Sequence, residues 1–183
     1  MKLLKRLSKK LELRRILIYM LVYLTLLFQT MPQLALATPT GATVVAGTAG
    51  VTQSVNTTSV AMTSDRAVIN WNSLDTVGGD VLTRETLQFT GPSGGFTVLN
   101  RVIEGGATQF DGTLLGNQGH SIIVNPHGVV FGQSAFIEAY KFTASSLNID
   151  NTDFMNGTYQ YYRDGDGAVI NRGTINGTAV NGV

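Results

Sequence analysis

The sequence predicts an all-β domain preceded by a signal peptide. Short runs rich in β-branched and aromatic residues recur after residue 40, and Gly, Asn, Asp or Thr bounds each of them. No window in that part of the chain keeps apolar residues at helical spacing for three turns. The first 37 residues are different, because a strongly basic stretch leads directly into an apolar one. These observations favour an exported protein built from short strands.

The N-terminal segment has the three parts of a secretory signal peptide. Seven of the 13 Lys and Arg residues lie in the first fifteen positions, and an unbroken apolar run of 13 residues follows from Ile16 to Phe28. Ala35 and Ala37 then form an A-x-A cleavage site. We expect residues 1–37 to be removed, so that the mature chain begins at Thr38. The alternative is an uncleaved membrane anchor, but a helix needs about 20 apolar residues to span a bilayer.

Removal of this segment changes the charge of the protein. Six basic and eleven acidic residues remain, so the formal charge becomes −5, and Lys141 is the only lysine left. Nucleic acid is therefore not expected as a partner, because a basic surface that could follow phosphates is missing. The chain has no cysteine, so disulfides cannot stabilise it. The mature chain is still long enough to bury the core of one domain.

The predicted strands are short and closely spaced. Ala67, Ile69 and Trp71 alternate with polar or smaller neighbours, which is typical of a strand with one buried face. Glycine pairs between the runs supply corners with positive φ. The runs are TVVA (43–46), AVINW (67–71), TLQF (86–89), FTVLN (96–100), SIIV (121–124), VVF (129–131), SLNI (146–149) and AVI (168–170).

An even spacing of three asparagines suggests how the strands are arranged. Asn125, Asn148 and Asn171 each follow an aliphatic residue and lie 23 positions apart. Such a period is found where one coil of chain stacks on the next, and Asn suits the corner of a coil. The spacing by itself leaves a β-helix and a β-sandwich equally open.

The octapeptide NPHGVVFG predicts a sharp turn between two strands. The ring of Pro126 holds φ at roughly −65° at the second turn position. Asn125 can bond back to the turn, and Gly128 tolerates the geometry of the exit. We expect the chain to pass a corner here, so that VVF runs along another face.

Four motifs, in order along residues 40–153, resemble one family. They are TGATVVAGTAGV (40–51), VINWNSL (68–74), VLNRV (98–102) and GHSIIVNPHGVVFGQSAFIEAYKFTASSLNI (119–149). Together they are similar to the N-terminal two-partner secretion domain of filamentous-haemagglutinin-type exoproteins, the haemagglutination activity domain. The sequence departs from the family at His127, where NPNG is usual, and at Leu74, where an aromatic residue is usual.

The resemblance implies a fold and a domain organisation. The fold is a right-handed parallel β-helix, a solenoid capped at its N-terminal end. Residues 38–155 would form the two-partner secretion domain, and residues 156–183 would begin a β-helical repeat region that is cut short. A final coil without a cap would also favour end-to-end self-association, because open strand edges pair with other chains.

The resemblance also implies a partner and a destination. A dedicated outer-membrane transporter would recognise the domain through its periplasmic domains, and strand addition is a suitable mode of contact. The protein would reach the surface of a Gram-negative-type bacterium, or the medium, through the periplasm, and it could meet a host-cell or surface receptor there. The alternative for the turn is a purely structural role. The residues expected in recognition are Asn70, Trp71, Asn72, Asn125, Pro126 and Gly128.

Catalytic and metal-binding patterns are not expected. His120 lies next to Ser121, so the two side chains would face opposite sides of a strand, and no nucleophile-elbow motif is found. Two histidines without cysteine offer few ligands for zinc. The segment YYRDGDG (161–167) lacks the downstream Glu of a calcium loop and is interpreted as a solvated turn. We therefore expect no enzyme, no metal and no cofactor.

Two other functions remain as alternatives to a secretion and adhesion module. One is an exported β-helical enzyme that acts on polysaccharide, and the other is a self-assembling structural protein of the cell surface. An enzyme of that kind lines a groove with several charged groups on one face. The mature chain has 17 charged residues, and the sequence shows no such cluster.

Overall fold

The structure is a computed structural model that describes residues 2–29, 38–80, 83–93 and 95–177. It divides into two units, residues 1–35 and residues 36–183. Each unit is described by itself.

The first unit contains one long helix, α1 (Lys2–Gln29). It includes the apolar run from Ile16 to Phe28 and the basic residues before it. The large apolar side chains described from Leu11 to Leu24 are exposed along its length. Within the described ranges, no helix combines the length and apolar character needed to cross a membrane. The predicted cleavage-site residues Ala35 and Ala37 lie outside the described residues.

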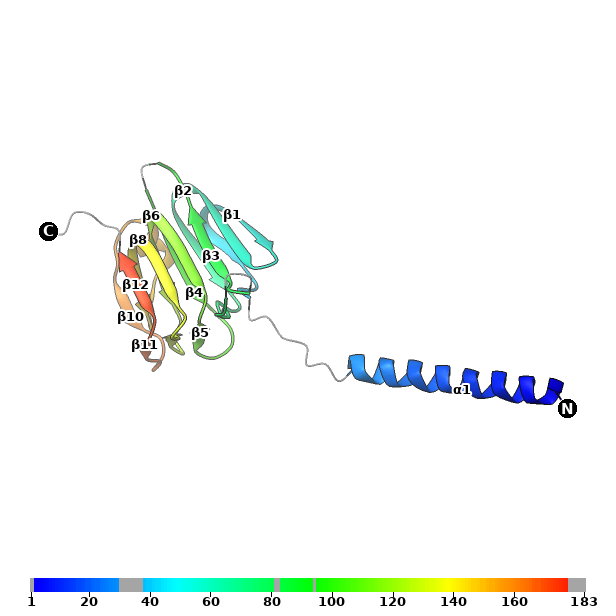
Figure 1. Ribbon diagram of the computed structural model, residues 1–183. Helices are drawn as coiled ribbons and strands as arrows, with labels where there is room; N and C mark the ends of the chain where they lie inside the picture. The colour runs from blue at the N-terminus through cyan, green and yellow to red at the C-terminus, as the bar shows by residue number, and fades with distance from the viewer. Residues whose placement is uncertain (1, 30–37, 81–82, 94, 178–183) are drawn as a thin grey trace. The chain divides into compact units, whose positions relative to one another are not determined.

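The second unit is built around a seven-stranded sheet (Figure 1). The strand order is β1-β2-β3-β6-β8-β12, and β4 also pairs with β2 and β6. Among the described strands of this sheet, β1 and β2 form the one antiparallel hairpin, and the other pairs are parallel. Its strands are β1 (Thr43–Ser54), β2 (Thr57–Trp71), β3 (Thr86–Thr90), β4 (Phe96–Val102), β6 (Thr113–Val124), β8 (Phe136–Ser145) and β12 (Thr174–Gly177).

A second, three-stranded sheet is parallel throughout. It has the order β11-β7-β5, and its strands are β5 (Thr108–Phe110), β7 (Val129–Phe131) and β11 (Val169–Asn171). The chain therefore leaves the large sheet at the end of β6, contributes β7 to the small sheet, and returns as β8 beside β6. Parallel neighbours are successive passes of the chain, which favours the stacked arrangement over a sandwich of antiparallel strands.

One segment leaves this stack between β8 and β11. It contains β9 (Leu147–Ile149), the short helix α2 (Asn151–Met155) and β10 (Tyr161–Arg163), and β10 pairs antiparallel with β9. Asp150 caps α2, because its side chain accepts hydrogen bonds from the backbone N–H groups of Thr152 and Asp153. We call residues 147–163 the covering segment.

The main core lies between the two sheets. Trp71, Leu114 and Ile137 reach it from the large sheet, and Phe110 and Phe131 reach it from the small sheet. The Phe110 and Phe131 rings meet edge to face with centroids 5.9 Å apart. Because the chain has no cysteine for a disulfide, this apolar contact and the strand ladders hold the domain together.

A second core lies on the opposite face of the large sheet. Val68, Leu99 and Ile122 point to that face, and Ile149 and Phe154 of the covering segment pack on them. The prediction that β2 has only one buried face is therefore wrong. Ala67, Ile69 and Trp71 do point to the main core, but Val68 is fully buried on the other side.

The strand predictions are confirmed at all eight runs, while the interpretation of the asparagine spacing is wrong. Some successive passes do have an offset of 23 residues, since Val98 pairs with Ser121 and Leu114 with Ile137, but the offset is 21 where His120 pairs with Lys141. The three asparagines, however, do not stack on one another. Asn148 pairs with Tyr162 and Asn171 with Phe131, whereas Asn125 follows β6 at a corner. The sequence also did not predict β5, β8, β10 and β12.

Candidate functional site

Trp71, the centre of the first predicted recognition motif, is part of the main core. Its side chain is fully buried at the end of β2, and its Nε1–H donates to Asn100 Oδ1 at 3.1 Å. Asn100 is also buried, and its amide nitrogen donates to the Ile122 carbonyl at 3.3 Å. In the folded domain, Trp71 cannot contact a partner directly.

The asparagines on either side of Trp71 are half-buried. Asn70 points to the opposite face of the sheet, where its Oδ1 accepts a hydrogen bond from Arg101 at 3.3 Å. Asn72 lies against Gly41, and its backbone N–H donates to the Thr40 carbonyl at 2.9 Å. Gly41 has φ +69°, and a Cβ at this position would overlap the Asn72 side chain. The motif therefore fixes the residues before β1 against the end of β2.

Arg101 connects this motif to the covering segment. Its Nε donates to Asn148 Oδ1 at 2.7 Å, Nη1 donates to Asn151 Oδ1 at 2.8 Å, and Nη2 donates to the Ile149 carbonyl at 2.6 Å. Burial lowers the pKa of Arg101, and the nearby Tyr162, Asp150 and Asp164 oppose that shift. A guanidinium suits this position because its donors diverge in one plane.

Sequence reasoning did not select Arg101 as a site residue. The available signal is its place in VLNRV, where a cation follows Asn within a stretch that is otherwise apolar. The network also continues beyond Arg101, since Asn148 Nδ2 donates to Asp164 Oδ2 at 2.8 Å. Asp164 belongs to the YYRDGDG segment, where Arg163 and Asp166 form an exposed ion pair.

The predicted turn at Asn125, Pro126 and Gly128 is confirmed. The Gly128 N–H donates to the Asn125 carbonyl at 2.9 Å, and Asn125 Oδ1 accepts from the His127 N–H at 2.9 Å. Gly128 has φ +107°. The turn takes the chain from β6 in the large sheet to β7 in the small one, as expected.

Asn125 also holds the preceding corner of the chain. Its side chain is buried, and its Nδ2 donates to the Gly106 carbonyl and to Thr108 Oγ1, both at 2.9 Å. Of the turn residues, only His127 is exposed. The turn is therefore connected to the preceding coil by buried hydrogen bonds of the Asn125 side chain.

The structure brings the two motifs to the same end of the large sheet. Asn70 pairs with Arg101 across β2 and β4, and Arg101 pairs with Val124, the residue before the turn, across β4 and β6. Since these strands are parallel, their carboxyl ends meet at one edge. We call this edge, with Arg101 at its centre, the motif edge.

The geometry does not support a serine-histidine pair. His120 and Ser121 face opposite sides of β6, as expected from the sequence. Ser121 is fully buried, and His120 Nε2 instead lies 2.8 Å from Thr143 Oγ1. In the described part of the chain, no three His, Cys, Asp or Glu residues gather in a way that could hold a metal ion.

A family model and a solved structure both indicate a secretion domain. Residues 35–182 match the model of the TPS secretion domain. The crystal structure of the HMW1 secretion domain from Haemophilus influenzae superposes with a TM-score of 0.65 and 30% sequence identity, over 74% of this chain and 35% of that chain. A heme/hemopexin-binding protein from Haemophilus influenzae is 31% identical over 100 residues, which are 55% of this chain and 10% of that protein.

A second heme/hemopexin-binding protein, from the Rd strain of Haemophilus influenzae, is 28% identical over 140 residues. These residues are 75% of this chain and 15% of that protein. The chain thus matches only a small part of the length of these two curated relatives.

Proposed function

We propose, because this chain belongs to the TPS secretion domain family, that it directs its own export through a dedicated outer-membrane transporter in two-partner secretion. It would be the N-terminal secretion domain of a haemagglutinin- or adhesin-like surface protein, exported through the periplasm of a Gram-negative bacterium to the cell surface or the medium. The relatives in Haemophilus influenzae support this destination. We assign no catalytic step to the domain.

We further propose that the fold is a right-handed parallel β-helix. The parallel ladders of both sheets support a helical path, because each return of the chain lies beside the previous pass. A connection between parallel strands of one sheet is nearly always right-handed. Residues 38–155 would be the secretion domain and residues 156–183 the start of a repeat region.

The observation that carries the proposal is the motif edge. The two predicted recognition motifs meet at one end of the large sheet, yet Trp71 and Asn125 are buried there. If the transporter reads these two side chains, it must do so before they are covered. We therefore propose that the transporter's periplasmic domains bind the chain while it is unfolded or partly folded, through strand addition.

Co-expression with a cognate transporter tests this function. We expect the protein to appear in the medium with the transporter and to remain in the periplasm without it. N-terminal sequencing of the released protein is expected to begin at Thr38, because the preceding segment is proposed to be a signal peptide. Retention in the periplasm beside a cognate transporter would contradict the secretion assignment, whereas release of protein that still carries Met1 would contradict only the cleavage site.

We also propose that the domain associates end to end. β12 is the last strand in the order of the large sheet, and β11 is the last in the small one. Val169, Ile170 and Ile175 on these strands are 44%, 38% and 41% exposed. Strand edges with exposed apolar residues pair with other chains.

Light scattering should therefore show an apparent mass that rises with protein concentration. The variant Ile175→Lys is expected to reduce this rise, because a charge on an edge strand opposes pairing. Asn171→Lys, at an exposed position of the small sheet, serves as a comparison for the contribution of that edge. A constant monomeric mass at all concentrations would contradict the proposal.

A further inference from the structure

A row of four side chains, with a basic residue at each end, crosses the outer face of the large sheet. Arg66 of β2 pairs with Thr97 of β4, Thr97 pairs with His120 of β6, and His120 pairs with Lys141 of β8. Neighbouring strands are about 4.8 Å apart, so the row extends for roughly 14 Å. All four residues line one groove of about 590 Å³.

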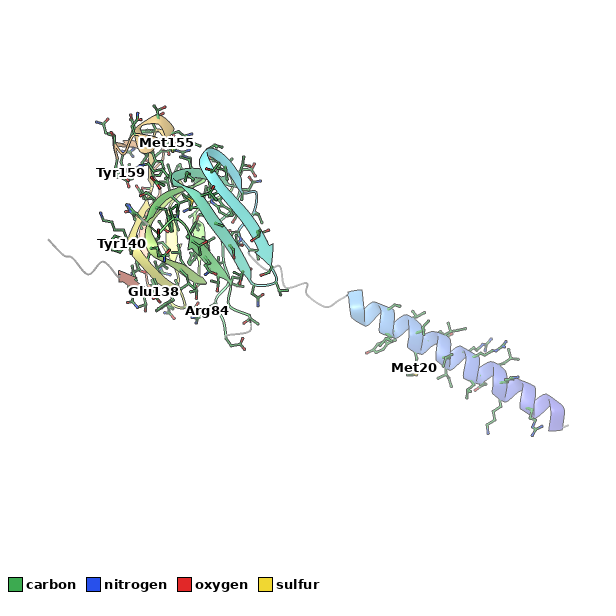
Figure 2. The ribbon with its side chains drawn as sticks, turned by 90° about the horizontal axis from the view of Figure 1, so that it is seen from above. Met20, Arg84, Glu138, Tyr140, Met155 and Tyr159 are labelled. Carbon is green, nitrogen blue, oxygen red and sulfur yellow. The ribbon has the colours of Figure 1, made fainter. Side chains whose placement is uncertain are left out.

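The covering segment leaves this row open. The next row on the same face, Val68, Leu99 and Ile122, is buried under Phe154. Tyr159, which follows α2, forms a wall of the groove, and Tyr140 lines it from β8. Figure 2 shows Tyr140 and Tyr159 on one side of the domain. The covering segment therefore borders the groove instead of filling it.

Two contacts fix Arg66 against this wall. Its Nη1 donates to the Tyr159 hydroxyl at 2.6 Å, and its guanidinium lies over the Tyr159 and Phe154 rings, 5.7 and 5.9 Å from their centroids. His120 meets Tyr159 edge to face, with centroids 6.1 Å apart. The Arg66 end of the row is thus held in place before any ligand arrives.

The charge of the groove is opposite to that of the domain. Residues 38–183 carry a formal charge of −5, but Arg66 and Lys141 both line the groove, and Asp65 is the only acidic residue among the described residues that line it. Burial, Lys141 and Arg66 lower the pKa of His120 to about 4, so its ring is neutral at pH 7. The groups around the ring therefore favour an added negative charge.

We propose that this groove binds a carboxylated saccharide whose acid groups lie along the row from Arg66 to Lys141. The row supplies charged donors for carboxylates. Tyr140, which is 43% exposed, supplies an aromatic surface for a sugar ring, and the Gln118 amide and the Thr97 hydroxyl can bond sugar hydroxyls. This binding would be separate from recognition by the transporter.

An acidic peptide fits the groove less well. The row runs across β2, β4, β6 and β8, and the first three of these strands each pair with a neighbour on both sides. A peptide that lies along the row crosses the strands, so it cannot gain affinity through backbone pairing. The ligand has to be recognised by side chains alone, which suits a ring with several hydroxyls and a carboxylate.

Titration calorimetry of the exported chain with trigalacturonate tests the proposal. We expect saturable binding, and no binding of neutral maltotriose. Lys141→Gln is expected to weaken binding at least about tenfold, and Arg172→Gln, which removes one positive charge outside the groove lining, is expected to leave it unchanged. Unchanged unfolding curves for both variants confirm that the fold is intact.

The His120 ring gives a second, independent readout. Three charged or titratable groups lie around the ring, Arg66, Lys141 and Tyr159, and the Thr143 hydroxyl lies 2.8 Å from its Nε2. A carboxylate bound beside it stabilises the imidazolium, so the pKa of His120 should rise in the complex and binding should tighten as the pH falls from 7 to 5. A His127→Asn chain leaves His120 as the only histidine for proton NMR.

Three results would overturn the proposal. The first is the lack of saturable trigalacturonate binding. The second is an equal weakening of trigalacturonate binding by Lys141→Gln and Arg172→Gln, which would indicate general electrostatic attraction instead of binding at a specific site. The third is tighter binding of triglutamate than of trigalacturonate, which would assign the groove to acidic peptides.

Discussion

A Gly128→Val chain is expected to lose about 3 kcal/mol or more of its free energy of unfolding and most of its release into the medium. Gly128 has φ +107°, which a β-branched residue avoids. A Cβ at this position would also lie 2.6 Å from the Ala168 carbonyl oxygen of the next coil. Since that neighbour is backbone, a small rotation of a side chain cannot relieve the overlap.

Two other substitutions in the same turn serve as controls for this prediction. Pro126→Leu is expected to have a smaller effect on the free energy of unfolding, about 1 kcal/mol. It removes the restriction on φ but leaves the space around the residue and the hydrogen bonds of the turn unchanged. His127→Asn should be neutral, because His127 is exposed and Asn is usual there in the family that the chain resembles. Urea unfolding and the amount of secreted protein would be measured for all three variants. Equal secretion of all three would show that the geometry of the turn is not required.

An Arg101→Met chain is expected to lose about 2–4 kcal/mol of its free energy of unfolding. We expect the covering segment to lose its protection from hydrogen exchange before the rest of the domain does. Methionine keeps the length of the side chain but removes the donors to Asn148, Asn151 and the Ile149 carbonyl. Those acceptors would then lie partly buried without their partner. Arg101→Lys should recover only part of the loss, because an ammonium group cannot donate in three fixed directions.

Hydrogen exchange of residues 147–163, together with urea unfolding, checks this prediction. Arg172→Met is a matched control, because the Arg172 side chain is exposed. Unfolding of the entire domain in one step, with no earlier exposure of the covering segment, would show that Arg101 supports the sheet rather than that segment.

The sequence predicted the strands well because their signal is local. Val129–Phe131, for example, is recognisable as an apolar run that follows a turn, and β7 has these bounds. The geometry of the turn was also predictable, since Pro126 and Gly128 each restrict the backbone in a known way. Such features depend on a few neighbouring residues and need no knowledge of the rest of the fold.

Contacts between residues that lie far apart in the chain were not predictable in the same way. The sequence did not show that Val68 would be covered by Phe154, because these residues lie far apart in the chain and their contact depends on the detour of the covering segment. The same reason applies to Arg101, whose partners lie 47 to 50 positions away on β9 and α2. The sequence did not predict the groove either. The four residues of its central row lie on four different strands, and only the register of strand pairing brings them side by side.

Trp71 shows what a recognised motif leaves open. The resemblance marks it as important, and the sequence cannot tell whether a tryptophan is kept for packing or for contact with a partner. Its full burial and its bond to Asn100 assign it a structural role in the folded domain. A role in recognition would require the unfolded chain, which remains a prediction.

The detour between β8 and β11 has a consequence for the chain entropy of the fold. Thr108 pairs with Val129, and Val129 pairs in turn with Val169, so the second pass of the chain is nearly twice as long as the first. Doubling a loop adds only about 0.6 kcal/mol to the free energy of closing it. Burial of a side chain such as Phe154 returns about 1.5–3 kcal/mol. Each coil can therefore gain a long excursion without weakening the strands that flank it, so the outer surface of the domain is free to diversify while the stack beneath keeps its register.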